Sequence, residues 1–328
     1  MDGIKNNPPG ATDPHFAVRT IFFARFTSRS LWWALLFCGL LSPASGVWAE
    51  TYPQRIISTS PSITEILFEL ELGDRVVGVT NFCSYPEEAC KLPKVGGLLN
   101  PNVEIWITLK SDLIIHQDDS HKLKANADNL RIRTLAVSLK SLDHIYASIK
   151  TIGETMGVPA NAERLIQKLQ SGINGFKTRL AGIEKKSVLL LLGDVDEPGR
   201  ELYAVGNTTF LGELLRLAGG ENIMTNTLAE YPIISKEFII RQSPEVIIEA
   251  GPKSNLTPEQ KQRRLKEWSR YPTLRAVKSK NITFIGASYI LIPGPRLLKI
   301  VDHFAQAIHP EIFKEPLDMS DHKENGSQ

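Results

Sequence analysis

The sequence predicts an α/β protein of two similar lobes with parallel-sheet cores, joined by one long α-helix. Short apolar runs alternate with amphipathic stretches along the chain, which is typical of parallel sheets covered by helices on both faces. One helix–turn–strand pattern occurs twice, at residues 102–115 and again at 235–248. A unit repeated once across a chain of this length indicates two lobes. A cleft between lobes is a common place for a small-molecule site.

The N-terminus is predicted to be a signal peptide covering residues 1–49. Basic residues precede an apolar stretch at 31–41, and small residues lead to Ala49, after which we expect cleavage. The stretch is too short for a permanent transmembrane helix, although an uncleaved anchor is the alternative. Phe37 before Cys38 argues against a lipoprotein. The mature chain is therefore expected in the periplasm.

The mature chain is expected to have no net charge. Removing residues 1–49 takes four of the 38 basic residues and two of the 36 acidic residues, which leaves 34 of each. A neutral chain offers no field for nucleic acid or an anionic membrane, so neither is an expected partner. Cys83 and Cys90 remain. In an oxidising compartment they could form a local disulfide, and two independent thiols are the equal alternative because geometry decides.

The first lobe is expected over residues 50–158. Strands are predicted at 55–57, 76–79, 113–115 and 134–137, with helices between them. The segment Ser60-Pro61-Ser62-Ile63-Thr64-Glu65 should open the first helix. Ser62 and Glu65 have the spacing of a capping box, which predicts a structural role for both.

A single helix is predicted to join the lobes over residues 159–185. From Pro159 to Glu184 apolar residues recur at three- and four-residue steps, and Asn161 is the expected N-cap. One crossing helix predicts a stiff connection. The second lobe, 186–314, repeats the scheme, with Gly219 ending a helix. Its strands are predicted at 188–192, 246–248 and 282–285, its closing helix at 296–308, and a disordered tail at 315–328.

The sequence carries no enzyme signature, and no catalytic residue is assigned. It has no nucleophile elbow, phosphate loop or HExxH motif. A metal site is not predicted either, because the tight group formed by His116, Asp118, Asp119 and His121 is more simply a solvated loop. An exported metal-binding protein or enzyme built on that group is kept as the alternative class. His303 and His309 are expected on a helix surface.

Four aromatic side chains fall in loops at the ends of predicted elements, where the cleft should lie. They are Phe82, Tyr85, Tyr231 and Tyr289. Each alone is as simply explained by packing of its own loop. Together they favour a flat or macrocyclic ligand, because aromatic faces offer a large apolar area at low entropy cost.

A set of short motifs is spread over residues 53–310. They are Ser60-Pro61-Ser62-Ile63-Thr64-Glu65, Asn81-Phe82-Cys83-Ser84-Tyr85-Pro86, Lys94-Val95-Gly96-Gly97, Asn102-Val103-Glu104, Gly219-Gly220-Glu221-Asn222-Ile223, Tyr231-Pro232 before Ser235-Lys236-Glu237, and Gly294-Pro295-Arg296. With these motifs the chain resembles the helical-backbone (class III) family of ABC-transporter substrate-binding proteins, and within it the branch that binds vitamin B12 (cobalamin). The resemblance implies a monomeric receptor, not an enzyme, that captures a corrinoid and delivers it to the membrane subunits of an importer.

The resemblance assigns a docking role to Glu104 and Glu237, one in each lobe. They match glutamates that insert into arginine pockets on the two membrane subunits. The residues themselves agree, since two exposed acids at equivalent helix starts suit a two-fold receptor. The alternative is that each acid only complements the dipole of its own helix.

The resemblance also assigns ligand contacts. Phe82 and Tyr231 match aromatic residues that contact cobalamin, and Ser288 is a matching polar contact beside Tyr289. Other positions differ from the cobalamin-binding branch, which keeps haem and ferric siderophores as alternative ligands of the same fold. Leu98 and Gln117 stand where that branch has tryptophans, and Ser288 and Ile292 stand where it has an acid and an arginine.

Overall fold

The computed structural model describes residues 52–97, 100–193, 201–225, 227, 229–252 and 256–313. The predicted signal peptide, the predicted tail and Leu98 lie outside these residues. Among the described helices, none combines the length and the apolar character that crossing a bilayer requires.

The sheet of the first lobe has four strands in the order β2-β1-β3-β4, and all of its pairings are parallel, as predicted. Successive side chains of a strand point to opposite faces, so Ile57 and Ile114 pack against Trp106, while Ile56 and Ile115 belong to the main core. The strands are β1 (Ile56–Ser58), β2 (Val76–Gly78), β3 (Leu113–Gln117) and β4 (Arg133–Val137).

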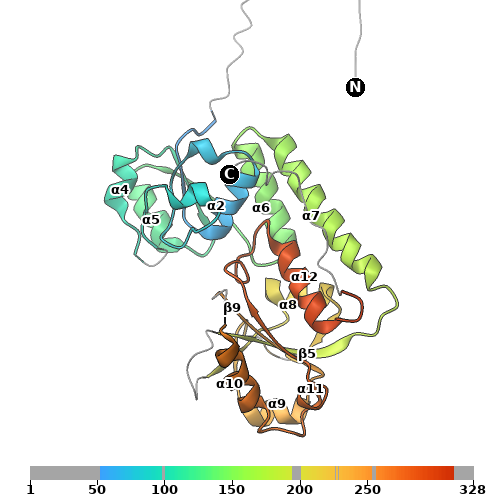
Figure 1. Cartoon of the computed structure of the whole chain (residues 1–328). Helices are drawn as coiled ribbons and strands as arrows, with labels where there is room; N and C mark the ends of the chain where they lie inside the picture. Colours follow the sequence, from blue (N-terminus) through green and yellow to red (C-terminus); the bar gives the residue numbers. More distant parts are fainter. Residues whose placement is uncertain are drawn as a thin grey trace, which may run out of the picture. The chain divides into compact units, whose positions relative to one another are not determined.

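Helices cover both faces of this sheet (Figure 1). On the face of Ile57 lie α4 (Val103–Thr108) and α5 (His121–Asn129). On the opposite face lie α2 (Pro61–Glu69) and α6 (Leu142–Thr155). The short η1 (Gly73–Arg75) and α3 (Glu87–Cys90) complete the lobe.

Helix α2 begins differently from the prediction. Ser60 is the N-cap, its hydroxyl accepting the Ile63 backbone N–H at 3.3 Å, and Pro61 occupies the first turn, where its missing N–H costs nothing. The predicted capping box of Ser62 and Glu65 is therefore wrong. Both residues are buried, and Glu65 has a partner in the other lobe, described below.

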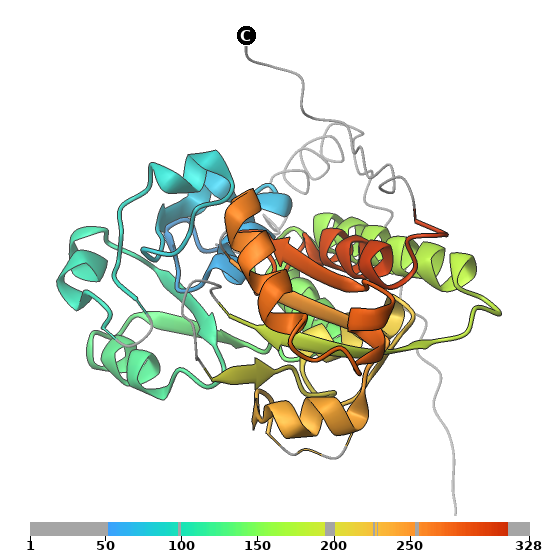
Figure 2. The same cartoon turned by 60° about the horizontal axis from the view of Figure 1, so that its bottom comes forward.

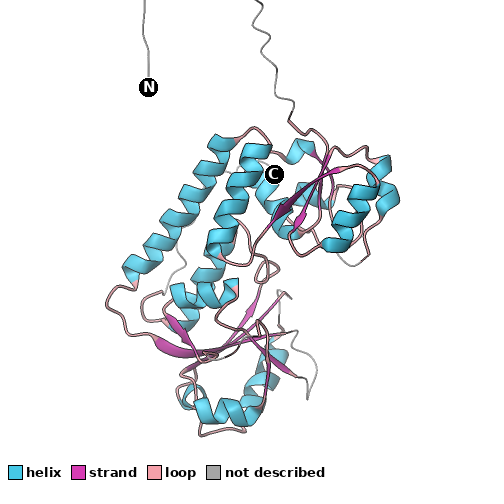
Figure 3. Ribbon diagram, turned by 180° about the vertical axis from the view of Figure 1, so that it is seen from behind, coloured by secondary structure: helices cyan, strands magenta, loops and turns pink. Residues whose placement is uncertain are grey.

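The long helix α7 (Pro159–Arg179) joins the two lobes and packs alongside α6 (Figure 3). Its 21 residues span about 30 Å at the α-helical rise. The predicted cap at Asn161 is wrong, because Val158 holds the N-cap position and the Asn161 side-chain amide donates to the Leu70 carbonyl oxygen at 3.0 Å. Helices α6 and α7 approach closely at Gly153, where a Cβ would lie 2.4 Å from the Ala162 Cβ.

The second lobe has a six-stranded mixed sheet, with the main order β10-β9-β5-β6-β8 and β7 pairing with β5. Strand β6 runs antiparallel to both β5 and β8. The sequence did not predict β6, β7 and β8, which are two or three residues long. The strands are β5 (Lys186–Leu192), β6 (Leu202–Ala204), β7 (Gly220–Asn222), β8 (Ile233–Ile234), β9 (Val246–Gly251) and β10 (Ile282–Gly286).

Both faces of the second sheet are also covered (Figures 1 and 2). Residues of β5 alternate between the two layers, with Val188 and Leu190 in the main core and Leu189 and Leu191 in a second cluster. The main-core face carries α8 (Phe210–Leu217) and α12 (Leu297–Ile308), and the other carries α9 (Lys236–Gln242), α10 (Pro258–Trp268) and α11 (Arg275–Lys278).

One continuous hydrophobic core connects the lobes. It runs from Ile56 in the first sheet, through Leu169 and Phe176 of α7, to Val188 and Phe304 in the second lobe. A hydrogen bond from the Leu142 backbone N–H to a Glu213 carboxylate oxygen, at 2.9 Å, also crosses between α6 and α8. A shared core opposes independent motion of the two lobes, because opening them would expose buried apolar surface.

Candidate functional site

Arg296 is the polar centre of the contact between the two lobes. Its Nε and Nη2 donate to the two carboxylate oxygens of Glu65, in α2, at 2.9 and 2.5 Å. Only 11% of the Arg296 side chain and 1% of the Glu65 side chain are exposed. The loop that carries Arg296 lies directly on α2, because a Cβ at Gly294 would be 3.7 Å from a Glu65 carboxylate oxygen. The geometry is a bidentate, largely buried ion pair.

Two predicted ligand residues, Tyr85 and Tyr289, stack on this arginine. The Arg296 guanidinium carbon lies 4.2 Å from the centroid of the Tyr85 ring and 4.8 Å from that of Tyr289. Both distances are within the range of a cation–π contact. Tyr85 comes from the first lobe and Tyr289 from the second, so the Arg296 guanidinium contacts one aromatic ring from each lobe.

Burial shifts the ionisation of the groups around Arg296. Desolvation raises the pKa of Glu65, and the hydrogen bonds and charge of Arg296 only partly oppose that rise. Desolvation also raises the pKa of Tyr289 and lowers the pKa of His303. The Tyr289 hydroxyl oxygen lies 2.7 Å from His303 Nε2. Because burial favours the neutral imidazole, His303 can accept the hydroxyl proton of Tyr289 in a hydrogen bond.

The other predicted ligand residues lie on separate loops of the described chain. Phe82 follows β2 and is 70% exposed, and its ring packs near Gly97, where a Cβ would lie 3.4 Å from the ring. Gln117 ends β3, and the exposed Ser288 follows β10. Tyr231 precedes β8, and partial burial raises the pKa of its phenol. Arg296 thus joins Tyr85 and Tyr289, while Phe82 shares the loop of Tyr85 and Ser288 shares that of Tyr289.

An acidic cavity of about 700 Å³ adjoins Tyr85 in the first lobe. Apolar side chains such as Phe68 form part of its wall. The described residues of the wall include no lysine or arginine, so the cavity is electronegative and disfavours anionic ligands. Its acidic residues are Glu65, Glu69, Glu71, Asp74 and Glu88.

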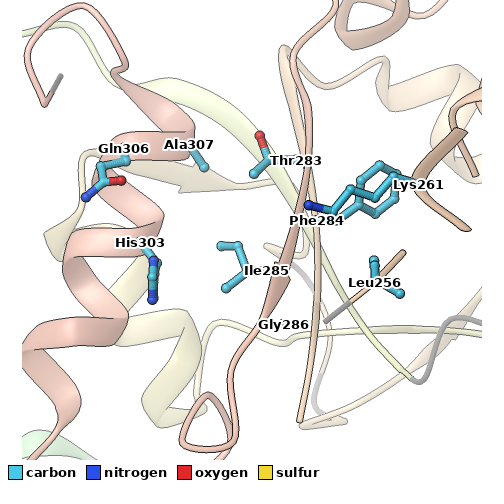
Figure 4. Close-up of a pocket in the computed structure, with 9 residues that line it drawn as sticks. All are labelled: Leu256, Lys261, Thr283, Phe284, Ile285, Gly286, His303, Gln306 and Ala307. Atoms are coloured by element: carbon cyan, nitrogen blue, oxygen red, sulfur yellow. The ribbon is translucent and has the colours of Figure 1, made fainter. Parts of the chain in front are cut away.

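A second cavity, of about 430 Å³, lies at the edge strand β10 of the second lobe (Figure 4). Ile285 and His303 line it on the side of α12, and Phe284 and Lys261 line it on the side of α10. The described wall contains none of the predicted ligand residues. Its connection to Tyr289 is the hydrogen bond between the Tyr289 hydroxyl and His303 Nε2.

The sequence missed the roles of four residues. Arg296 ended a recognised motif without an assigned contact, and Glu65 was explained as a helix cap. His303 and His309 were expected on a helix surface, which is wrong: His303 is half-buried, and His309 is fully buried with its Nε2 3.2 Å from the Gly219 carbonyl oxygen. No local pattern identifies these contacts, because their partners are distant in the sequence.

Both cysteines are free thiols in this structure. The buried Cys83 sulfur lies 3.1 Å from the hydroxyl oxygens of Thr64 and Thr80. The exposed Cys90 thiol donates to the Ser84 carbonyl oxygen at 3.3 Å. Of the two alternatives, a local disulfide or two independent thiols, the structure has the independent thiols, and each sulfur has a hydrogen-bond partner of its own.

The loop considered as an alternative metal site does not assemble a ligand set. Within the described part of the chain, no group of three or more histidine, cysteine, aspartate or glutamate residues is placed to hold a metal ion. His116 is 2% exposed, and its Nδ1 donates to the Gln117 carbonyl oxygen at 2.7 Å. In the described residues, this segment therefore does not form the ligand set that a metal-binding alternative would need.

The repeated pattern forms equivalent structural units in the two lobes, at α4 and α9. Asn102 accepts the Ile105 backbone N–H at 3.3 Å, and Ser235 accepts that of Phe238 at 3.2 Å. The second residue of each helix is a glutamate, Glu104 or Glu237, and both are exposed. The pKa of Glu237 is lowered, chiefly by a hydrogen bond with its own backbone N–H and then by the Ser235 hydroxyl.

The equivalence extends through the turn that follows each helix. Lys110 and Ser243 both adopt left-handed conformations, with φ of 49° and 42°. The acid before each strand then binds the first strand segment of its lobe. Asp112 accepts the Arg55 backbone N–H at 3.0 Å, and Glu245 accepts that of Ser187 at 2.8 Å. The two glutamates are thus held in equivalent local frames.

Comparison with known proteins identifies the family of this chain. Residues 56–289 match the family described as periplasmic binding protein. An uncharacterized ABC transporter substrate-binding lipoprotein of Bacillus subtilis, YvrC, is 31% identical over 273 residues, which are 80% of this chain and 82% of that protein. A vitamin B12-binding protein of Pectobacterium carotovorum is 28% identical over 205 residues, 62% of this chain and 73% of that protein.

A solved structure shows the same fold. The periplasmic heme binding protein from Pseudomonas aeruginosa aligns with a TM-score of 0.68 and 24% identity, covering 81% of this chain and 95% of that chain. The span that matches the family includes the sheets of both lobes and the helix between them. The chain belongs to the periplasmic binding protein family.

Proposed function

We propose that this chain is the periplasmic substrate-binding protein of an ABC importer, and that it captures a corrinoid, vitamin B12, and delivers it to the membrane permease. It acts as a monomer after removal of the signal peptide and makes or breaks no covalent bond. The observation that carries the proposal is the pair Tyr85 and Tyr289, one from each lobe, held on Arg296. A macrocycle between the lobes meets an aromatic face from each.

Charge favours a corrinoid over the alternatives of the same fold. Cyanocobalamin is neutral overall, whereas haem carries two propionates and ferric siderophores are commonly anionic. The first-lobe cavity beside Tyr85 is walled by acids and by no described lysine or arginine, and the cation at the aromatic pair, Arg296, is paired with Glu65; these surroundings disfavour an anionic ligand. The vitamin B12-binding relative supports the same choice.

The first test is calorimetric titration of cyanocobalamin into purified residues 50–328. Saturable one-to-one binding, with a Kd in the micromolar range or tighter, supports the corrinoid. No heat from a protein that is folded by circular dichroism rules it out, and a parallel titration with haem then decides for that ligand. Tyr85→Leu should weaken binding at least about 10-fold, because it loses an aromatic face. Tyr85→Phe keeps the ring and serves as the matched control.

We propose that Glu104 and Glu237 dock the loaded protein onto basic pockets of two membrane subunits. Both carboxylates are exposed at equivalent helix starts, so replacing them should not disturb the ligand site. The double variant Glu104→Gln/Glu237→Gln should retain the Kd for cyanocobalamin and abolish uptake of the labelled vitamin by cells. Glu184→Gln/Glu221→Gln, which changes two other exposed acids, is the control. Normal uptake by the first variant would refute docking through these glutamates.

A further inference from the structure

Each proposed docking helix exposes an isoleucine next to its glutamate. Ile107, in α4, is 58% exposed, and Ile240, in α9, is 41% exposed. Each lies three residues after the glutamate, and residues three apart share one face of a helix. The residue just before each isoleucine is buried instead, Trp106 at 0% and Ile239 at 1%. Glutamate and isoleucine therefore share the solvent face of both helices, which lie in different lobes (Figure 1).

Identity between the exposed positions of the two units is confined to this pair. Over the helix and turn, residues 102–110 aligned with 235–243, the same residue type occurs only at Glu104 with Glu237 and at Ile107 with Ile240. The other identities of the repeat, Ile114 with Ile247 and Ile115 with Ile248, are buried strand residues. The neighbours differ in chemistry, as Thr108 aligns with Arg241. Contacts within each unit account for its cap and its buried residues. They do not account for the exposed isoleucine.

An exposed isoleucine leaves much of its apolar surface in water, here 58% for Ile107 and 41% for Ile240. A β-branched side chain also lowers helix propensity slightly. A single exposed apolar residue on a protein surface needs no explanation. The same residue at the equivalent position of both lobes, beside the same acid, indicates a surface that meets the same partner chemistry twice.

We propose that Ile107 and Ile240 are the apolar halves of two equivalent docking epitopes, each made of one glutamate and one isoleucine. The partner is a pair of symmetry-related membrane subunits, each offering a cationic pocket bordered by an apolar contact. This inference rests on the proposed docking function. Two copies of one epitope fit a two-fold partner. The glutamates complement a basic surface and oppose insertion into an anionic lipid surface.

The pair divides the work of docking. The carboxylate is complementary to a basic pocket and guides the encounter. The isoleucine becomes buried only in the complex, so it contributes to the lifetime of that complex. Truncating either isoleucine to serine should weaken binding about 10-fold, because the complex then buries less apolar surface. The double variant should lose about 100-fold if the two contacts are independent.

The test uses the labelled mature protein and inner-membrane vesicles. The vesicles come from a strain of the source bacterium in which the gene for this chain is deleted. Binding is measured for the wild type, Ile107→Ser, Ile240→Ser, the double isoleucine variant and Glu104→Gln/Glu237→Gln. The control Ile183→Ser/Leu265→Ser changes side chains that are 41% and 44% exposed elsewhere. Vesicles of extracted lipid alone test for a lipid contact. Cyanocobalamin titration and thermal melts check that every variant keeps its ligand site and its fold.

The outcomes separate this inference from the docking function itself. Weaker binding of both the glutamate and the isoleucine variants, with the control unchanged, supports the two-part epitope. Loss with the glutamate variant alone keeps docking and overturns the isoleucine contact. Loss with the isoleucine variants alone keeps the apolar contact and overturns the glutamate role. Undiminished binding of all variants overturns both. If the wild type binds vesicles of extracted lipid as tightly as it binds inner-membrane vesicles, and the isoleucine variants lose that binding, the partner is lipid. That outcome overturns the inference.

Discussion

Removing one partner of the Glu65–Arg296 pair should destabilise the protein far more than breaking an exposed pair. Both side chains are nearly excluded from water. Deleting one partner of a buried ion pair costs about 3–5 kcal/mol, because the other charge stays buried and uncompensated. Arg296→Met also removes two cation–π contacts, each worth about 0.5–2 kcal/mol. Met retains part of the apolar stem, so we expect a loss near 4 kcal/mol by the same principle.

The matched control is Lys91→Met. Lys91 pairs with Glu87 at 3.2 Å, but these side chains are 72% and 84% exposed. An exposed pair contributes about 0–1 kcal/mol. A second control is the double variant Glu65→Leu/Arg296→Met, which removes both charges. Replacing a buried pair by apolar residues is often neutral or stabilising, so the double variant should recover most of the stability lost by Arg296→Met.

The raised pKa of Glu65 adds a dependence on pH. Its folded-state pKa lies above the ordinary 4.5, so the folded protein binds this proton more tightly than the unfolded chain does. That contribution to stability is fully present below pH 4.5 and is lost as the pH rises through the folded-state pKa. Arg296→Met removes the group that lowers this pKa, so the folded pKa should rise further. The loss caused by Arg296→Met should therefore be smaller at pH 5 than at pH 7.5.

The assay is urea unfolding of residues 50–328 at both pH values, monitored by circular dichroism. The continuous core predicts one cooperative transition, for which the midpoint and slope give the free energy of unfolding. Equal losses from Arg296→Met and Lys91→Met at pH 7.5 would refute the reasoning. A loss that grows at pH 5 would refute the argument about Glu65.

Three further predictions concern packing and ionisation. A Cβ on Gly172 would lie 2.4 Å from Leu298 Cδ1, whereas a Cβ on Gly175 would have nothing within 4 Å. Gly172→Ala should lower the free energy of unfolding by about 1–3 kcal/mol, and Gly175→Ala should raise it by up to about 1 kcal/mol. Equal melting temperatures of the two variants would contradict this. Trp106→Ala should cost about 3–5 kcal/mol and its exposed neighbour Ile107→Ala about 0.5 kcal/mol or less, as measured by urea unfolding. Burial lowers the pKa of His303 below 6.5, so its contribution is present above pH 6.5 and is lost as the pH falls; His303→Gln should lose less stability than wild type between pH 7.5 and 5.5, and parallel unfolding curves would disprove it.

Features encoded within a few residues were predictable from the sequence. The buried strand at 188–192 and the amphipathic helix that begins at Pro159 both show their periodicity in one stretch of chain. The repeated units at α4 and α9 were predictable for the same reason, since each cap, glutamate and turn lies within about ten residues. The parallel pairing of the first sheet was predictable from the alternation of strands and helices, whereas its strand order was not predicted.

The contacts at the centre of the candidate ligand site were not predictable, because they join distant residues. Glu65 and Arg296 are 231 positions apart, and the local spacing of Ser62 and Glu65 suggested a cap instead. Asn161 likewise bonds Leu70, 91 positions away, in place of its own helix start. A polar residue near a helix end satisfies either role equally well from sequence alone. Tertiary packing decides between them.

The two kinds of proposed site differ in how far the lobes repeat each other, and the difference has a physical reason. The units at α4 and α9 agree in cap, exposed glutamate, exposed isoleucine and left-handed turn. The loops that carry Tyr85 and Tyr289 agree in little beyond an aromatic ring. A receptor made of two related membrane subunits presents the same surface twice and keeps the two epitopes alike. A small ligand has no two-fold axis, so the loops that hold it are free to diverge. The chain is duplicated where the proposed partner is symmetric.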